Sequence, residues 1–143
     1  PPGSGKTTLL RDLVRQLSDR LGQRVGLVDS RGELAACVDG QPQLAVGRPT
    51  DVVSLMPKAE AMELLIRSMS PRWIAVDEIT APADVEAMAG ASYCGVGLLA
   101  TAHGYGREDL ARRPLYRRLA GLGVFSLLVI LDGQKQYRME RMD

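Results

Sequence analysis

The sequence predicts an α/β fold in three layers, with helices on both faces of a mainly parallel β-sheet. First, short apolar segments such as VGLVD at 25–29 and WIAV at 73–76 show no polar alternation, which is typical of strands buried on both faces. Second, segments with helical spacing of apolar residues lie between these strands, as in a parallel sheet. Third, polar residues follow several strands, at the sheet edge where α/β proteins bind ligands.

Length and composition fit one ordinary globular domain. The chain has 143 residues, of which 45% are hydrophobic and 24% charged, enough for a single core. Its formal net charge of +1 gives no general case for nucleic-acid binding, which usually needs a strongly basic face. The two cysteines lack metal-ligand spacing and suit a reducing cytosol. The expected location is therefore cytoplasmic. No apolar run approaches the roughly 20 residues that span a bilayer.

The first half of the chain alternates helix and strand. Apolar residues recur at helical spacing after the start of the chain, and Gly22 is placed to end that helix. Pro57 stands where a second helix would open, a position that tolerates proline, and Ser70 with Pro71 would stop it. In order, the expected elements are a helix at 7–21, a strand at 25–29, a loop at 37–53 with room for a short strand, and a helix at 58–69.

The second half continues the alternation and contains the longest apolar run, Val124 to Leu131. We expect that run to form a buried strand, because it is apolar without interruption. The helix before it is polar and rich in arginine. In order, the expected elements are a strand at 73–76, a helix at 84–93, a strand at 96–102, a helix at 108–119, a strand at 124–131 and an edge strand at 136–142.

Residues 1–8 read PPGSGKTT, which fits the end of the phosphate-binding pattern G-x-x-x-x-G-K-[ST]. Glycines let the backbone N–H groups surround phosphate oxygens, and the following helix adds its positive end. We expect Lys6 to reach the β- and γ-phosphates of ATP and the Thr7 hydroxyl to ligate Mg²⁺. The predicted nucleotide-binding residues are Pro2, Gly3, Ser4, Gly5, Lys6, Thr7 and Thr8.

The leading glycine of this pattern would stand just before Pro1, and so would the strand that normally precedes the pattern. We therefore interpret residues 1–143 as one P-loop ATPase domain that begins inside its first motif. The strand before Pro1 would be central in the sheet. We expect the domain to depend on it, because two neighbouring strands would otherwise lack a partner.

WIAVDE at 73–78 is the second motif, an apolar strand that ends in two acids. The pattern indicates a Walker B element in which Asp77 holds Mg²⁺, often through water, and Glu78 polarises the attacking water. Small-molecule kinases usually lack the adjacent glutamate, which favours an ATPase. The alternative, two solvated carboxylates at a strand end, loses weight because a phosphate-binding pattern lies upstream.

Further polar residues follow the other strands. VDSRGE at 28–33 ends one strand, and its Glu33 competes with Glu78 as the water-activating acid; the alternative is a turn with solvated charges. Thr101 and His103 end another strand, in the segment ATAH. With the strand ahead of Pro1 counted as the first and a sheet order of 5-1-4-3-2, these two residues lie between the two motifs. His103 could then sense the γ-phosphate.

The order of these motifs resembles that of the type II/IV secretion ATPase superfamily, in which an arginine and a proline similarly precede Walker B, here Arg67 and Pro71. More narrowly, the chain resembles the stage III sporulation protein AA family over nearly its whole length. The stretches that carry this resemblance are VDSRGELAAC, PKAEAMELLIRSMSP, AVDEI, LLATAHG and EDLARRPLYRRL.

The resemblance implies an ASCE, RecA-like ATPase fold and hydrolysis of ATP with Mg²⁺. It also implies a homo-oligomer, expected to be a hexameric ring. The family is placed at the inner, mother-cell face of the membrane around the forespore of a spore-forming bacterium. There it is held to drive a channel built by partner membrane proteins.

The sequence departs from the family at Ser30, where an acid is usual. If that acid helps to activate water, this protein is slower or Asp29 and Glu33 share the task. Arg31 and Arg67 are in-chain candidates for the arginines that contact nucleotide, or else ordinary surface residues. A cluster of four arginines is interpreted as a solvated helix face or a subunit contact: Arg112, Arg113, Arg117 and Arg118.

Two other functions compete with the motor. One is an ATPase that acts on nucleic acid, which would need a binding appendage outside this chain. The other is a scaffold that binds nucleotide without hydrolysing it, an alternative that Ser30 leaves open. A small-molecule kinase is a more distant alternative, because the sequence shows no lid or acceptor site.

Overall fold

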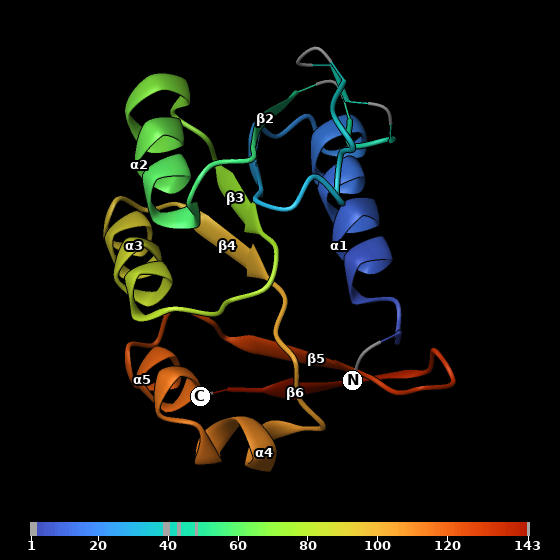
Figure 1. The fold of residues 1–143 in the computed structure, drawn as a ribbon, viewed down its shortest axis with the longest axis vertical. Helices are drawn as coiled ribbons and strands as arrows, with labels where there is room; N and C mark the ends of the chain where they lie inside the picture. The colour runs from blue at the N-terminus through green and yellow to red at the C-terminus, as the bar shows by residue number, and fades with distance from the viewer. Residues whose placement is uncertain (1–2, 39–40, 43, 48, 143) are drawn as a thin grey trace.

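The computed structural model describes residues 3–38, 41–42, 44–47 and 49–142. Its elements, drawn in Figure 1, form two sheets with helices packed around the larger one. They are α1 (Lys6–Arg15), the π-helical turn η1 (Gln16–Arg20), β1 (Val25–Asp29), β2 (Thr50–Ser54), α2 (Lys58–Met69), β3 (Trp73–Val76), α3 (Pro82–Tyr93), β4 (Gly97–Ala100), α4 (Arg107–Arg112), α5 (Pro114–Gly121), β5 (Leu127–Leu131) and β6 (Tyr137–Arg141).

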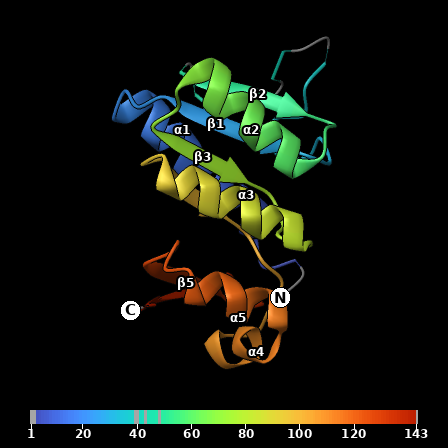
Figure 2. The same cartoon turned by 90° about the vertical axis from the view of Figure 1, so that its left-hand side faces the viewer.

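The larger sheet has four parallel strands in the order β2-β1-β3-β4. Helix α1 covers one face, and α2 and α3 cover the other, as the two views in Figures 1 and 2 show. The predicted three-layer arrangement is confirmed. The adjacency of β1, β3 and β4 is the 4-3-2 part of the expected strand order, and β2 adds an outer strand beyond β1.

Two apolar cores lie on the two faces of this sheet. Successive strand residues point to opposite faces, so Val28 packs with α2 and α3 while its neighbour Leu27 packs with α1. All five residues of β1 are buried, as its unbroken apolar sequence predicts. Packing on both faces therefore fixes the central strands. This in turn fixes the position of the residues that directly follow them.

The strand register brings the ends of three strands together. Val28 pairs with Val76, and Val76 pairs with Ala100. Parallel strands end at the same edge of a sheet, so Asp29, Asp77 and Thr101 follow side by side.

One predicted helix is wrong. Instead of a single helix at 108–119, α4 ends at Arg112 and α5 begins at Pro114. Proline has no N–H to continue the helical hydrogen bonds and disfavours helical geometry in the residue before it. Arg113 is accordingly extended, with φ −92° and ψ 126°. The chain turns here, and the two short helices lie together beneath the larger sheet, as Figure 1 shows.

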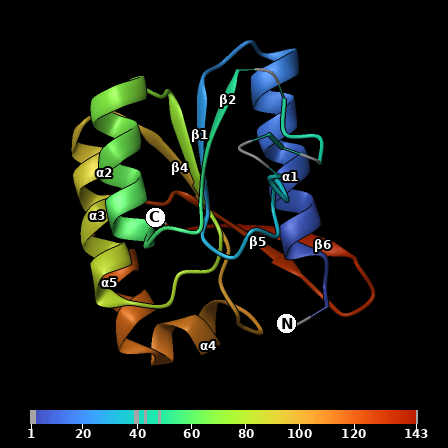
Figure 3. The ribbon, with the colours of Figure 1, turned by 45° about the horizontal axis from the view of Figure 1, so that its top comes forward.

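The prediction of a buried strand at 124–131 is also wrong in part. A strand forms at Leu127–Leu131, but it pairs only with β6, in a separate antiparallel sheet. Leu127 is 50% exposed and Val129 37% exposed. Figure 3 shows this hairpin lying across the end of the larger sheet, with its turn near the start of α1. Within the described residues, no helix is both long enough and apolar enough to cross a membrane.

We expect Gly97→Ala to destabilise the fold by about 1–3 kcal/mol, the usual cost of overpacking a core. A Cβ on Gly97 would lie 2.5–2.8 Å from atoms of the Trp73 ring. That ring has little room to move, because its Nε1 donates a hydrogen bond to Gln23. The free energy of unfolding in denaturant tests this.

The matched control is Gly90→Ala in the exposed part of α3, where an added Cβ meets no atom within 4 Å. Alanine there should stabilise the protein by roughly 0.5–1 kcal/mol, because glycine loses more backbone entropy on folding. Equal midpoints for wild type and Gly97→Ala would contradict the packing described for β3 and β4.

Candidate functional site

A cavity of about 450 Å³ lies where β1, β3 and β4 end, beside the start of α1. Most of the predicted site residues line it. The lining residues are Gly3, Gly5, Lys6, Thr7, Thr8, Arg31, Glu33, Asp77, Glu78, Thr101, His103 and Lys135. Of the other residues predicted to bind nucleotide, Ser4 is buried and does not line the cavity, and Pro2 lies outside the described residues.

The turn that leads into α1 depends on two glycines. Gly3 has φ 72° and Gly5 has φ 92°, in the left-handed region, although an added Cβ would meet nothing within 4 Å at either position. Glycine is therefore required by the backbone conformation and not by lack of space. The N–H groups of a helix's first turn have no partner within the helix, and the described first turn of α1 carries no acidic residue. This end of α1 suits an anion.

The loop after β1 is anchored from both sides. The carboxylate of Asp29, which is fully buried, accepts hydrogen bonds from the N–H groups of Leu34 and Ala35 at 3.0 and 2.9 Å. From α1, the Arg11 guanidinium donates to the carbonyls of Glu33 and Leu34 at 2.9 and 2.6 Å. These bonds hold Arg31 and Glu33 at the cavity. They also engage the Asp29 carboxylate, so the water-activating role considered for Asp29 is wrong.

Asp77 is bound by Ser30, the position at which the sequence is expected to depart from the family pattern. The Ser30 hydroxyl lies 2.9 and 2.8 Å from the two carboxylate oxygens of Asp77 and donates to them. Burial raises the pKa of the Asp77 carboxyl, while the Ser30 hydrogen bond and the Lys58 ammonium act in the opposite direction. An acid at position 30 would instead place a second negative charge against Asp77.

The Glu78 carboxylate lies close to one residue after each of the two neighbouring strands, β1 and β4. Its Oε2 lies 3.2 Å from Nη2 of Arg31 and 3.9 Å from Nε2 of His103. The structure thus brings together the predicted water-activating acid, the predicted γ-phosphate sensor and one of the two candidate arginines. The other candidate, Arg67, is in the last turn of α2 and does not line the cavity.

A largely buried lysine that the motifs do not include holds the segment after β3. Lys58, whose side chain is 12% exposed, forms an ion pair with Asp84 at 3.3 Å. Its ammonium also donates to the carbonyl oxygen of Glu78 and to the Thr80 hydroxyl. Asp84 in turn accepts the N–H groups of Thr80 and Ala81 at 3.0 Å. This clamp fixes the backbone that carries Glu78.

Helix α5 is bonded to two of the loops at the cavity. Arg113 donates to the carbonyl of His103 at 2.7 Å and lies 5.7 Å from the centre of the Tyr116 ring. The Tyr116 hydroxyl donates to the carbonyl of Ile79 at 2.8 Å. The interpretation of the arginine cluster as a solvated face is therefore wrong for Arg113, whereas Arg118 forms a surface ion pair with Glu86.

The side chains at the cavity fit a magnesium ion only together with a nucleotide. Among the described residues, no group of three or more His, Cys, Asp or Glu side chains could hold a metal. The Thr7 hydroxyl and the Asp77 carboxylate are oxygen donors at the same cavity. Mg²⁺ prefers oxygen ligands and commonly takes one or two from protein, with the rest from water and phosphate. This donor set is of that kind.

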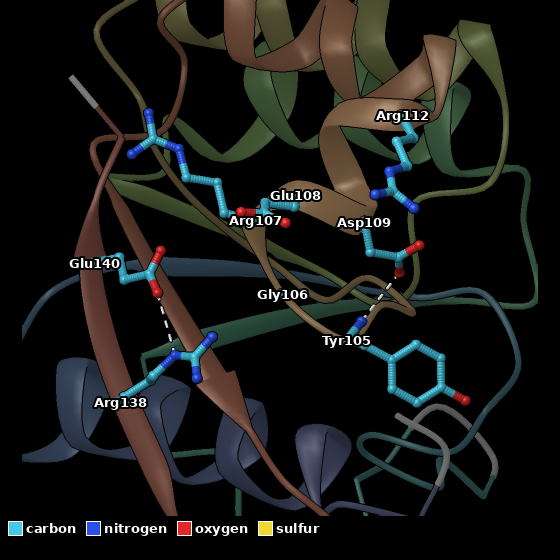
Figure 4. Close-up of a pocket in the computed structure, with 8 residues that line it drawn as sticks. All are labelled: Tyr105, Gly106, Arg107, Glu108, Asp109, Arg112, Arg138 and Glu140. Carbon is cyan, nitrogen blue, oxygen red and sulfur yellow. Dashed lines mark hydrogen bonds and ion pairs between the residues drawn. The ribbon is translucent and has the colours of Figure 1, made fainter.

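A second cavity of about 540 Å³ lies between α4 and β6, as Figure 4 shows. Its charged lining residues are three arginines and three acids: Arg107, Arg112 and Arg138, with Glu108, Asp109 and Glu140. Arg138 already pairs with Glu140 at 3.1 Å, and two of the acids stand in the first turn of α4. An anion is therefore disfavoured there compared with the start of α1.

The sequence and the fold both match known proteins. The model of the family "Sporulation stage III, protein AA" matches residues 1–140. Stage III sporulation protein AA of Bacillus subtilis (strain 168) is 45% identical over 123 residues, covering 83% of this chain and 40% of that protein. The fold is similar to that of the Legionella pneumophila ATPase DotB, with a TM-score of 0.63 at 18% identity.

A second similar structure is the VirB11 ATPase of the Brucella suis type IV secretion system, solved in complex with sulphate, with a TM-score of 0.60 at 21% identity. The match covers 96% of this chain and 41% of DotB, and 98% of this chain and 46% of VirB11. The chain thus spans less than half the length of each relative. At these identities the two structures establish the fold alone, which this chain shares with the ATPases DotB and VirB11.

We expect Lys58 and Asp84 to show strong coupling in a double-mutant cycle. Lys58→Met alone leaves a nearly buried carboxylate without its cation, which should cost about 3 kcal/mol of folding stability. Adding Asp84→Asn should cost less than it does alone, with a coupling energy of roughly 1–3 kcal/mol. The free energies of unfolding of the four proteins measure this, and additive effects would refute the clamp.

Proposed function

Because the chain belongs to the sporulation stage III protein AA family, we propose that it binds and hydrolyses ATP as part of a motor for a membrane channel. The observation that carries the proposal is that one cavity is lined by Lys6 and Thr7 from the glycine turn and by Asp77 and Glu78 from the end of β3. These are the groups that phosphoryl transfer needs: phosphate binding, a metal position and a carboxylate for water.

Different residues would bind the phosphates and the magnesium ion. The N–H groups at the start of α1, together with the Lys6 ammonium, hold the phosphate chain. The Thr7 hydroxyl and the Asp77 carboxylate hold Mg²⁺, which when bound neutralises charge on the phosphate oxygens. Ser30 orients the Asp77 carboxylate through the hydrogen bonds described above. The fold's similarity to secretion ATPases supports this assignment.

Glu78 orients the water that attacks the γ-phosphorus, with ADP as the leaving group. The Lys58 clamp fixes its backbone, and Arg31 and His103 hold its carboxylate. His103 would report the γ-phosphate to a neighbour, because its backbone is bonded to Arg113 and through it to α5. Glu33 is a competing water-activating acid; it also lines the cavity.

The proposed motor is a homo-oligomer, expected to be a hexameric ring with sites shared between subunits. In support, the side chains of Arg31 and His103 remain 56% and 42% exposed at the cavity, where a neighbour could contribute to the site. From the family we further propose that the protein acts at the cytoplasmic face of a membrane, with membrane proteins of a sporulation or secretion channel as partners. Nucleic acid is not among the proposed partners.

We expect Lys6→Ala to abolish detectable ATPase activity, because the variant loses the charged contact to the β- and γ-phosphates. Glu78→Gln should retain ATP binding within a few-fold but lower turnover at least about 100-fold, as for loss of a positioned acid or base. Glu63→Gln on the exposed face of α2 is the matched control and should behave as wild type. Turnover and ATP affinity should be measured on all four proteins.

Wild-type turnover in Lys6→Ala would refute the assignment of the site. Tight ATP binding without turnover in the wild type would instead favour the scaffold alternative. If Glu78→Gln turns over normally while Glu33→Gln does not, the water-activating role belongs to Glu33.

Specific activity should rise with protein concentration if neighbouring subunits share sites, because assembly follows mass action. Sedimentation over the same concentration range should show the oligomer forming as activity rises. A constant specific activity in a sample that remains monomeric would contradict the shared site.

A further inference from the structure

The turn between β5 and β6 presents a lysine that neither the motifs nor the proposed function uses. Asp132 locks this turn: its Oδ1 accepts the N–H groups of Gln134 and Gln136 at 2.8 and 2.9 Å. The N–H of Lys135 donates to the carbonyl of Asp132 at 3.2 Å, and the N–H of Asp132 donates to the carbonyl of Gln136 at 3.0 Å. Lys135 is therefore held by a defined turn.

The backbone of Lys135 is strained. Its φ is 62°, a left-handed conformation that costs a non-glycine residue roughly 1–2 kcal/mol. Glycine or asparagine commonly occupies such positions, yet the glycine of this turn is Gly133, two residues earlier. Strained residues of this kind cluster at functional sites. Of the four left-handed non-glycine residues in the described chain, Ala36, Leu55, Ser70 and Lys135, only Lys135 lines the cavity.

The position of Lys135 suggests such a role. It lines the same cavity as Lys6, Thr7 and Asp77, although it comes from the hairpin, which is a separate sheet. Figures 1 and 3 show the hairpin turn close to the start of α1. Among the described residues, no ion pair or side-chain hydrogen bond engages its ammonium group.

The charges at the cavity favour an added anion near this lysine. Three basic residues line the cavity, Lys6, Arg31 and Lys135, and so do three acids, Glu33, Asp77 and Glu78. Arg31 pairs with Glu78, whereas none of the ion pairs among the described residues engages Lys135. A bound Mg²⁺ would offset part of the acidic charge, so Lys135 would then add positive charge available to an anion. An ammonium of this kind binds a phosphate as a point charge and tolerates some freedom in geometry, because its four-carbon stem is flexible.

We propose that Lys135 is an additional phosphate-binding residue, through which the β5–β6 hairpin contacts the nucleotide. This inference rests on the proposed function, because it assigns Lys135 to the same nucleotide. It gives the hairpin a role that its sparse packing otherwise leaves unexplained: bound nucleotide ties it to the start of α1 and orders the cavity.

The left-handed backbone of Lys135 allows a test in which loss of the side chain does not destabilise the fold. Lys135→Gly removes the charge and also relieves the left-handed backbone, so the variant should unfold at the same or a higher temperature than wild type. Its affinity for a non-hydrolysable ATP analogue with Mg²⁺, measured by titration calorimetry on the full natural chain, should fall about tenfold, as for loss of one charge-assisted contact. Lys135→Arg should keep most of the affinity, and the neighbouring Gln134→Ala should bind as wild type.

Unchanged affinity in Lys135→Gly would overturn the proposal, and so would equal weakening in Lys135→Arg and Lys135→Gly. The Lys6→Ala variant distinguishes failure of the role assigned to Lys135 from failure of the proposed function. If Lys6→Ala loses binding and Lys135→Gly does not, only the role of Lys135 fails. If the wild type binds no ATP analogue, the proposed function fails and the role of Lys135 fails with it.

Discussion

The parallel register of β1, β3 and β4 is the constraint on which the rest of the site depends. Val28, Val76 and Ala100 are paired across these strands, and apolar cores hold the strands on both faces. The polar residues that follow must therefore meet at one edge, beside the start of α1. Because a register shift of a single residue would turn every buried strand side chain to the other face, the packing that stabilises the sheet also positions the acids.

Three charged groups, of which Asp29 is fully buried, then fix the loops that follow the strands. Asp29 binds the loop after β1, Lys58 binds the segment after β3, and Arg113 binds the carbonyl of His103 after β4. The loops that these groups anchor carry residues that line the cavity: Arg31 and Glu33 after β1, Glu78 after β3 and His103 after β4. Loop backbone that would otherwise be mobile is thereby held in place, as a preorganised site requires. Arg113 also links this edge to α5, so a change at the cavity could reach the surface of the domain.

Much of this arrangement was predictable from local sequence, and the exceptions have physical reasons. The strands at 25–29 and 73–76 form as expected, because short apolar runs bounded by polar residues have few other solutions. Pro114 itself indicates a helix break before it, but the polar, arginine-rich segment at 108–119 was predicted as one continuous helix. The exposure of β5 could not be predicted from its apolar sequence, because burial depends on which strand it pairs with. Lys58 and Lys135 were missed because their contacts join segments far apart in the chain.

The most direct test of the account is an experimental structure of the protein with Mg²⁺ and a non-hydrolysable ATP analogue. We expect the phosphates against the start of α1 and Lys6, the metal between Thr7 and Asp77, and a water near Glu78 in line with the γ-phosphorus. A nucleotide bound instead in the cavity between α4 and β6, or phosphates that make no contact with the glycine turn, would contradict the assignment of the site and the mechanism that follows from it.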